Sequence, residues 1–153
     1  MGATMRHVVG KQGVTLARRL QKYRTACSGK HVVAGYISGV STSASIERAY
    51  KNEFGAGTTT DFGKKMPARP FISQSVPIMK YAVEVEAETL NVNHPDEFLE
   101  RAGRTMADSI RVSIDTGSFE RNSDFTIGQK GHSKVLVDTG EMYKNAKSQI
   151  RKG

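Results

Sequence analysis

Apolar residues recur at the spacing of an α-helix in two parts of the chain. Residues 14–24 combine an apolar side with a largely basic one, which predicts an amphipathic helix. A second and longer stripe consists of Leu99, Ala102, Met106, Ile110 and Ile114. Pro95 and Gly117 predict where this second helix begins and ends, with Asn93 or His94 as its N-cap. Both stripes are typical of packing against a core.

In other segments the pattern favours a β-strand or fits a strand and a helix equally well. Residues 31–38 are rich in Val, Tyr and Ile, which predicts a strand. Residues 41–45 are rich in Ser and Thr and predict a turn, and residues 46–54 after it predict a strand or a short helix. Two neighbouring segments of this kind suggest a hairpin and therefore an antiparallel sheet.

Pro77 predicts the first turn of a helix that runs to about residue 90. The strict alternation of residues 83–88 is also typical of a strand, and we favour the helix. Residues 118–134 contain many polar residues and glycines and predict an irregular loop.

A last helix is predicted over residues 141–150, with Asp138 or Thr139 as its cap. Taken together, the elements predict an α+β fold in which a small antiparallel β-sheet is flanked by helices. We expect one domain, residues 13–153, preceded by a flexible N-terminal arm, residues 1–12, because no second boundary or internal repeat is visible.

One extended polar loop lies between two large apolar residues. Residues 56–66 are rich in Gly and Thr, which favour loops over packed structure. Phe54 precedes this loop and Phe71 follows it, and we expect both rings to be buried and to hold its ends. The prolines of Pro-Ala-Arg-Pro stiffen the second arm, so that Arg69 is presented on a rigid segment.

The composition suits a single domain and shows two separated blocks of charge. The chain has 153 residues, 37% of them hydrophobic, and a net charge of +8. Residues 1–30 contain basic but no acidic residues, whereas residues 81–100 contain acidic but no basic ones. Such blocks can steer association with nucleic acid or with neighbouring subunits. No apolar run is long enough to predict a membrane span, and the lone Cys27 excludes an internal disulfide.

Candidate catalytic and metal-binding motifs are weak. Asp-Thr-Gly, which carries the catalytic carboxylate in aspartic proteases, begins at Asp115 and again at Asp138. These copies lie too close together for two β-lobes, and too little chain follows the second for a dimeric protease. The four histidines are scattered without metal-ligand spacing. We therefore expect no catalytic, cofactor-binding or metal site.

Two patches carry a resemblance to a known family. The first combines Asn-Glu-Phe-Gly, residues 52–55, with Pro-Ala-Arg-Pro-Phe, residues 67–71. The second consists of Thr-Ile at 126–127, Lys-Gly at 130–131 and Leu-Val-Asp-Thr-Gly at 136–140. In sequence and order they resemble the small morphogenesis proteins of tailed phages, which are the neck, head–tail joining or tail-completion subunits.

The resemblance implies a structural virion protein that forms part of a homo-oligomeric ring at the head–tail joint. Its expected neighbours are head connector or head-closure proteins and tail tube or tail terminator proteins, with transient contact with passing DNA. The family implies no enzyme activity, no cofactor and no membrane contact, and assembly in the host cytoplasm. Alternative functions are a tail terminator that caps the tail tube, or a basic nucleic-acid-binding module using residues 6–30.

The resemblance also implies roles for single residues. Arg69 and Asp138 are the charged residues inside the quoted motifs, and with Phe54 and Phe71 they are the expected interface or structural determinants. The guanidinium of Arg69 offers a rigid fork for a carboxylate or for carbonyl groups of a neighbour. The alternative for Arg69 is a solvated loop residue, and for Asp138 a helix cap within its own subunit.

Overall fold

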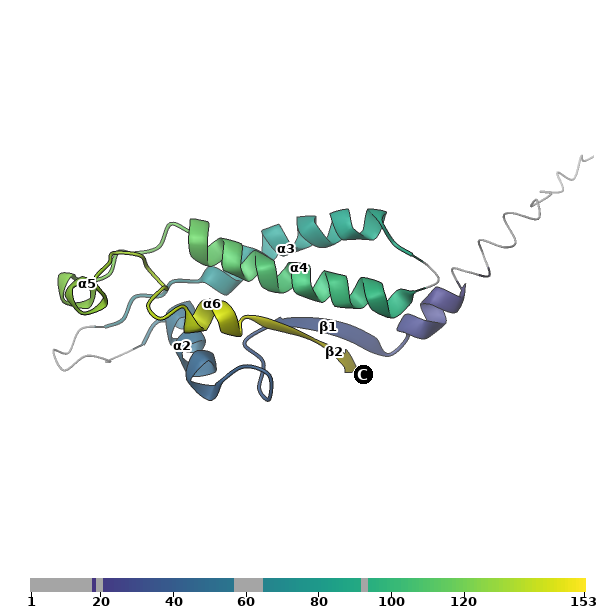
Figure 1. Ribbon diagram of the computed structural model, residues 1–153, viewed down its shortest axis with the longest axis horizontal. Coiled ribbons are helices and arrows are strands. Elements are labelled where there is room, and N and C mark those ends of the chain that lie inside the picture. The colour runs from purple at the N-terminus through teal and green to yellow at the C-terminus, as the bar shows by residue number, and fades with distance from the viewer. Residues whose placement is uncertain (1–17, 19–20, 57–64, 92–93) are drawn as a thin grey trace, which may run out of the picture.

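The chain folds as an α+β body with a two-stranded antiparallel sheet, as predicted (Figure 1). The computed structural model describes residues 18, 21–56, 65–91 and 94–153. In order, the elements are β1 (Lys30–Gly35), α2 (Ser43–Phe54), α3 (Phe71–Glu88), α4 (Pro95–Thr116), α5 (Asp124–Lys130), α6 (Glu141–Asn145) and β2 (Lys147–Lys152). Residues 21–27 are also helical. The predicted arm, residues 1–12, lies outside the described residues, as do residues 57–64 of the predicted loop.

Helix α4 is the middle layer of the fold, with α3 on one side and the sheet on the other (Figure 1). Its predicted bounds are confirmed, with His94 at the N-cap, Pro95 in the first turn and Gly117 at the C-cap. His94 makes no side-chain capping hydrogen bond. Of the predicted stripe, Ala102, Ile110 and Ile114 are buried. A local apolar period therefore identified the helix that the other layers pack against.

The sheet pairs the two ends of the described chain. Strand β1 runs antiparallel to β2, with Val32 opposite Ile150 and Ala34 opposite Ser148. The predicted hairpin of residues 31–38 with residues 46–54 is therefore wrong. The prediction of a helix over 141–150 is also wrong beyond α6, because this segment turns into β2. Only Ser148 and Ile150 of β2 are partly buried, so its mostly polar sequence gives a weak strand signal.

Helix α2 replaces the second strand of that hairpin, so the alternative of a short helix over residues 46–54 is confirmed. The hydroxyl of Thr42 caps its N-terminus by accepting a hydrogen bond from the backbone N–H of Ser45, at 3.3 Å. Ser45, Ala49 and Asn52 are buried at a helical spacing along one side. The Ser/Thr-rich segment read as a turn therefore begins a helix, because its hydroxyl groups bond to the backbone at the helix start.

Helix α3 begins at Phe71, six residues before the predicted start, and contains Pro77 in its interior. The alternative of a strand over residues 83–88 is wrong, because these residues belong to the last turns of α3. Pro70 at the N-cap makes no side-chain capping hydrogen bond. The N-terminus of α3 is capped instead by a side chain of α2, and the sequence of residues 70–77 alone does not predict this contact.

The hydrophobic core lies where α2, α3, α4 and α6 meet. It is formed by Ala49, Phe71, Ile110, Ile114, Leu136, Met142 and Ala146. Phe71 is fully buried, as predicted, and its ring packs edge-on against Tyr36 at 5.9 Å between centroids.

The predicted irregular loop over residues 118–134 contains α5, whose N-cap is Ser123. No helix in the described part of the chain is long and apolar enough to cross a membrane.

Candidate functional site

The segment Asn-Glu-Phe-Gly joins the end of α2 to the start of α3. The backbone carbonyl of Asn52 accepts a hydrogen bond from the backbone N–H of Arg69, at 2.6 Å. Its buried side-chain amide donates to the carbonyl of Arg48 at 2.8 Å and contacts the sulfur of Met142 at 3.8 Å. Asn52 therefore ties together α2, the segment before α3, and α6.

Glu53 caps helix α3 from outside that helix. Its carboxylate accepts hydrogen bonds from the backbone N–H of Ile72, at 2.8 Å, and of Ser73, at 3.0 Å, and from the Ser73 hydroxyl. The side chain is only 6% exposed. A negative charge at a helix N-terminus satisfies free N–H groups and interacts favourably with the helix dipole. This pairing fixes the entry of α3 against the end of α2.

The base of the polar loop is closed by backbone pairing. Ala56 and Met66 form an antiparallel bridge with N–H···O distances of 3.2 and 3.1 Å. Gly55 takes a left-handed conformation (φ 75°), and a Cβ there would lie 2.8 Å from the carbonyl oxygen of Met66. Glycine is required here for conformation and for space. The prediction that the loop is held at its ends is confirmed at its base.

Phe54 does not hold the loop by burial, and that part of the prediction is wrong. Its ring is 68% exposed and lies beside Tyr50, at 5.0 Å between centroids. The reason is helical geometry: Asn52 and Glu53 occupy the inner side of the last turn of α2, which leaves Phe54 facing outward. Phe71 alone of the two rings is part of the core.

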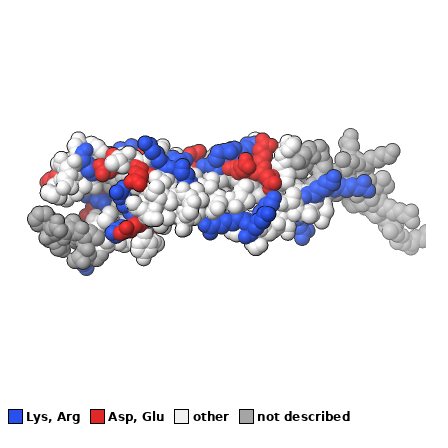
Figure 2. All heavy atoms as spheres, turned by 60° about the horizontal axis from the view of Figure 1, so that its bottom comes forward, with Lys and Arg blue, Asp and Glu red and all other residues white. Residues whose placement is uncertain are grey.

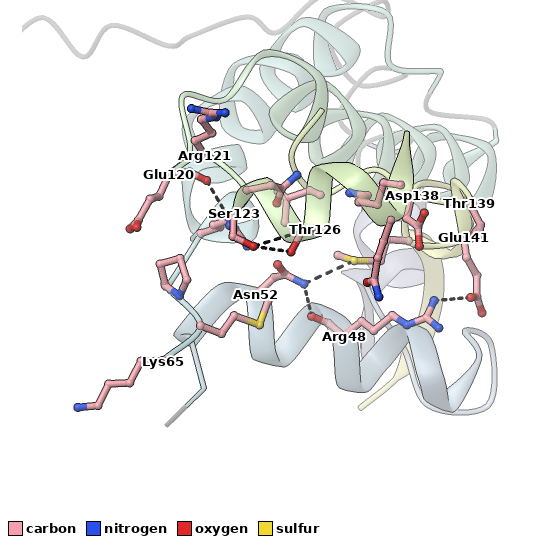
Figure 3. A pocket seen from close by; sticks show the side chains of 18 residues that line it. Arg48, Asn52, Lys65, Glu120, Arg121, Ser123, Thr126, Asp138, Thr139 and Glu141 are labelled. Carbon is pink, nitrogen blue, oxygen red and sulfur yellow. Dashed lines mark hydrogen bonds and ion pairs between the residues drawn. The ribbon is translucent and has the colours of Figure 1, made fainter. Parts of the chain in front are cut away.

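The two sequence patches, far apart along the chain, line one groove of about 630 Å³ (Figure 3). The groove lies between α2, the loop base, α5 and the segment leading into α6. From the first patch come Asn52, Pro67 and Arg69, and from the second come Thr126, Lys130, Leu136, Asp138 and Thr139. The fold therefore brings residues of both patches onto a single surface, although other motif residues, among them Phe54 and Phe71, do not line it.

Arg69 is a buried residue of this groove and not a solvated loop residue. It is 7% exposed, and its Nε donates a hydrogen bond to the backbone carbonyl of Glu120 at 3.0 Å. Burial lowers the pKa of Arg69, while the charge of Glu120 acts in the opposite direction. Both Nη atoms, with two N–H donors each, have no acceptor among the described residues.

Lys130 links Arg69 electrostatically to Asp138. The pKa of Lys130 is lowered, chiefly by burial. The negative charge of Asp138 opposes this shift, and the positive charge of Arg69 adds to it. Its Nζ donates to the backbone carbonyl of Lys134 at 3.2 Å. Lys130 was part of the quoted Lys-Gly motif but was not singled out, because only the tertiary structure shows that its neighbours are charged.

Asp138 lies exposed on the groove wall and does not cap α6 (Figure 3). The N-cap of α6 is Gly140, and no side chain caps that helix, so the prediction of Asp138 or Thr139 as cap is wrong. Leu136, two residues earlier, has a left-handed backbone (φ 61°) and a buried side chain. Such a conformation costs about 1–3 kcal/mol for a non-glycine residue, and burial of the side chain offsets it.

The groove carries five basic and three acidic side chains. The basic ones are Arg48, Lys65, Arg69, Arg121 and Lys130, and the acidic ones are Glu120, Asp138 and Glu141. Arg48 pairs with Glu141 at 2.7 Å (Figure 3) and Arg121 with Asp124 at 2.7 Å, so much of the positive charge is matched within the chain. The remaining surplus favours acidic partner groups. Among the described residues, no cluster of His, Cys, Asp and Glu could hold a metal ion.

Comparison of the chain with protein-family models, with curated proteins and with solved structures found no match.

Proposed function

We propose that this protein is a structural subunit of a tailed-phage virion, of the neck or tail-completion type, and part of a ring that joins the head connector to the tail. The observation that carries the proposal is the groove. The motifs at residues 52–55, 67–71, 126–127, 130–131 and 136–140 resemble that family in sequence, and eight of the 18 residues that line the groove belong to them. Motif residues from two segments far apart in the chain share this groove, which suggests a common docking surface.

In this proposal the groove receives an acidic segment of a neighbouring virion protein. The two Nη atoms of Arg69 are suited to a carboxylate, because a guanidinium fork can donate two parallel hydrogen bonds. Burial and the contact with Glu120 hold that fork in one place, which reduces the entropy lost on binding. The mechanism is geometric: the subunit orders a neighbour and no covalent bond is made or broken.

The location is tested by cryo-electron microscopy of the intact particle. The proposal expects density for this chain at the head–tail joint, between the connector and the tail. Density that caps the end of the tail tube would instead identify a tail terminator. Absence of the chain from purified particles would refute a structural virion role, and a salt-dependent affinity of the chain for DNA would then favour the nucleic-acid-binding alternative.

The groove is tested with matched variants in a particle-completion assay. Arg69→Ala and Asp138→Lys should both reduce the yield of completed particles, with Arg69→Lys restoring part of it because the charge returns without the fork. Asp138 is exposed, so its replacement should leave the free energy of unfolding nearly unchanged. Arg104→Ala and Glu97→Lys serve as controls on the exposed surface of α4. Normal yields from both groove variants would contradict docking at this surface.

A further inference from the structure

The layered body leaves two outer faces uncovered on opposite sides. In the described part of the chain, α4 is the helix that packs on the sheet, and α3 packs mainly on the other side of α4 (Figure 1). Gly103 of α4 lies close to Val32 and Ser148, so these residues face the helix. Because side chains alternate along a strand, the neighbouring residues face away from α4.

The outward side of the sheet, here called the sheet face, is formed by His31, Val33, Gly35, Lys147, Gln149 and Arg151. His31, Lys147, Gln149 and Arg151 are exposed, and the face has no acidic residue. Neither Lys147 nor Arg151 forms an ion pair with a described residue. Figure 2, in which the bottom of Figure 1 comes forward, shows basic side chains gathered on the lower side of the body.

The outward side of α3, here called the α3 face, is formed by Val76, Lys80, Tyr81, Glu84, Val85 and Glu88. Three of these are apolar or aromatic and unusually exposed: Val76 at 55%, Tyr81 at 70% and Val85 at 45%. Exposed aromatic and apolar groups beside charged ones are typical of an interface.

The acidic residues of this face remain without ion-pair partners. In the acidic block 81–100, Glu86 is paired with Arg101, and Asp96 is paired with Lys30 at 2.6 Å. Glu84 and Glu88 are exposed and form no ion pair with a described residue. Glu97 and Glu100 of α4 are also exposed and form no ion pair with a described residue, so the α3 face carries two of the four acidic side chains of this block that the described chain does not neutralise.

We propose that the α3 face of one copy docks on the sheet face of the next copy. The occupant is a second copy because the two faces complement each other: Glu84 and Glu88 meet Lys147 and Arg151, and the exposed side chains of α3 cover the sheet. The C-terminal ends of α3 and β2 both lie toward the same end of the molecule (Figure 1). Stacking copies side by side thus brings the acidic and basic groups together.

Contact between two different faces is heterologous, and it closes into a ring when the rotation between copies allows. This inference rests on the proposed ring-forming function and names the surfaces that build the ring. The groove lies at the other end of the body, among α2, α5 and α6, and stays free for a different protein (Figure 1). Ring closure and docking of a neighbour therefore use separate surfaces.

The contact is expected to be weak for a single pair. Helix α3 has 18 residues, which gives a strip roughly 27 Å long and about 10 Å wide. Typical stable interfaces bury about 800 Å² per partner, which is more than such a strip supplies. Closure adds a second contact for every copy, so association should be cooperative and should appear at high protein concentration.

Charge reversal on each face tests the proposal by sedimentation velocity across a concentration series. The variant Glu84→Lys/Glu88→Lys and the variant Lys147→Glu/Arg151→Glu should each associate about a hundredfold more weakly than the unchanged chain. An equal mixture of the two variants should recover association, because the reversed α3 face then meets the reversed sheet face and the unchanged pair remains. Glu47→Lys/Glu97→Lys is the control with the same change in net charge as the α3-face variant, and it should associate normally.

Several results would overturn the inference. A chain that stays monomeric at every concentration, or reversed variants that associate like the control, would show that these faces do not meet. Loss of association without recovery in the mixture would also refute their pairing. If reversal on the sheet face lowers affinity for DNA and leaves self-association intact, that face binds nucleic acid. The location of the chain in the particle is measured separately, so failure here leaves the proposed function standing.

Discussion

Replacing Glu53 should destabilise the fold more than its place near the end of a short helix suggests. Its carboxylate accepts hydrogen bonds from the N–H groups of Ile72 and Ser73 and from the Ser73 hydroxyl, and it is nearly buried. These N–H groups lie in the first turn of α3, where no intrahelical acceptor exists. Glu53→Ala removes the acceptor for all three groups.

The magnitude follows from the contacts. Loss of an N-cap costs about 0.5–2 kcal/mol, and a buried donor left without a partner costs about 1–3 kcal/mol more. Since the contributions overlap, we expect the free energy of unfolding to fall by about 2–4 kcal/mol for Glu53→Ala. Glu53→Gln keeps an oxygen acceptor without the charge, so its cost should be about half as large.

The control is Glu47→Ala on the same helix. Glu47 is exposed and pairs with Lys51 one turn away at 2.6 Å, an arrangement that contributes little to stability because solvent screens it. Urea unfolding of the three variants, with comparable m-values, measures the differences. If Glu53→Ala lowers the free energy of unfolding no more than Glu47→Ala does, the carboxylate of Glu53 does not cap α3.

Three further results are expected. Phe71→Ala should cost about 3–5 kcal/mol because its ring is fully buried, whereas Phe54→Ala should cost less than about 0.5 kcal/mol, and equal losses in thermal unfolding would contradict the assigned burial. Gly55→Ala should destabilise more than Gly39→Ala, since both have positive φ but only at Gly55 would the new Cβ meet backbone, and urea unfolding decides between them. Self-association should weaken as salt rises, because exposed charges are screened beyond about 8–10 Å, and light scattering that is indifferent to salt would remove the electrostatic part of the interface.

Local patterns predicted the parts of the fold that are stabilised locally. The stripe from Leu99 to Ile114, with Pro95 before it and Gly117 after it, predicts α4 almost to the residue. The period of a helix and the chemistry of its ends involve neighbours only three or four positions apart. The prediction of an α+β fold with a small antiparallel sheet was correct, although the second strand was assigned to the wrong segment.

The pairing of the sheet was decided by tertiary structure. Strand β2 has a polar sequence, and its partner β1 lies more than one hundred residues away in the chain. Cross-strand contacts and the cover supplied by α4 stabilise β2, and neither is visible within a short window. Residues 46–54 were predicted as a strand of a hairpin or as a short helix, and the helix, capped by the hydroxyl of Thr42, is the alternative that is confirmed.

The candidate site shows the same division. The sequence by itself indicated Arg69 and Asp138 as site residues, and the prolines around Arg69 as a stiff support. Only the fold could show that Arg69 is buried against Glu120, that Lys130 lies among both charges, and that Glu53 caps a helix to which it does not belong. Burial and electrostatic neighbours depend on segments that meet through packing, and such contacts leave no periodic signal in the sequence.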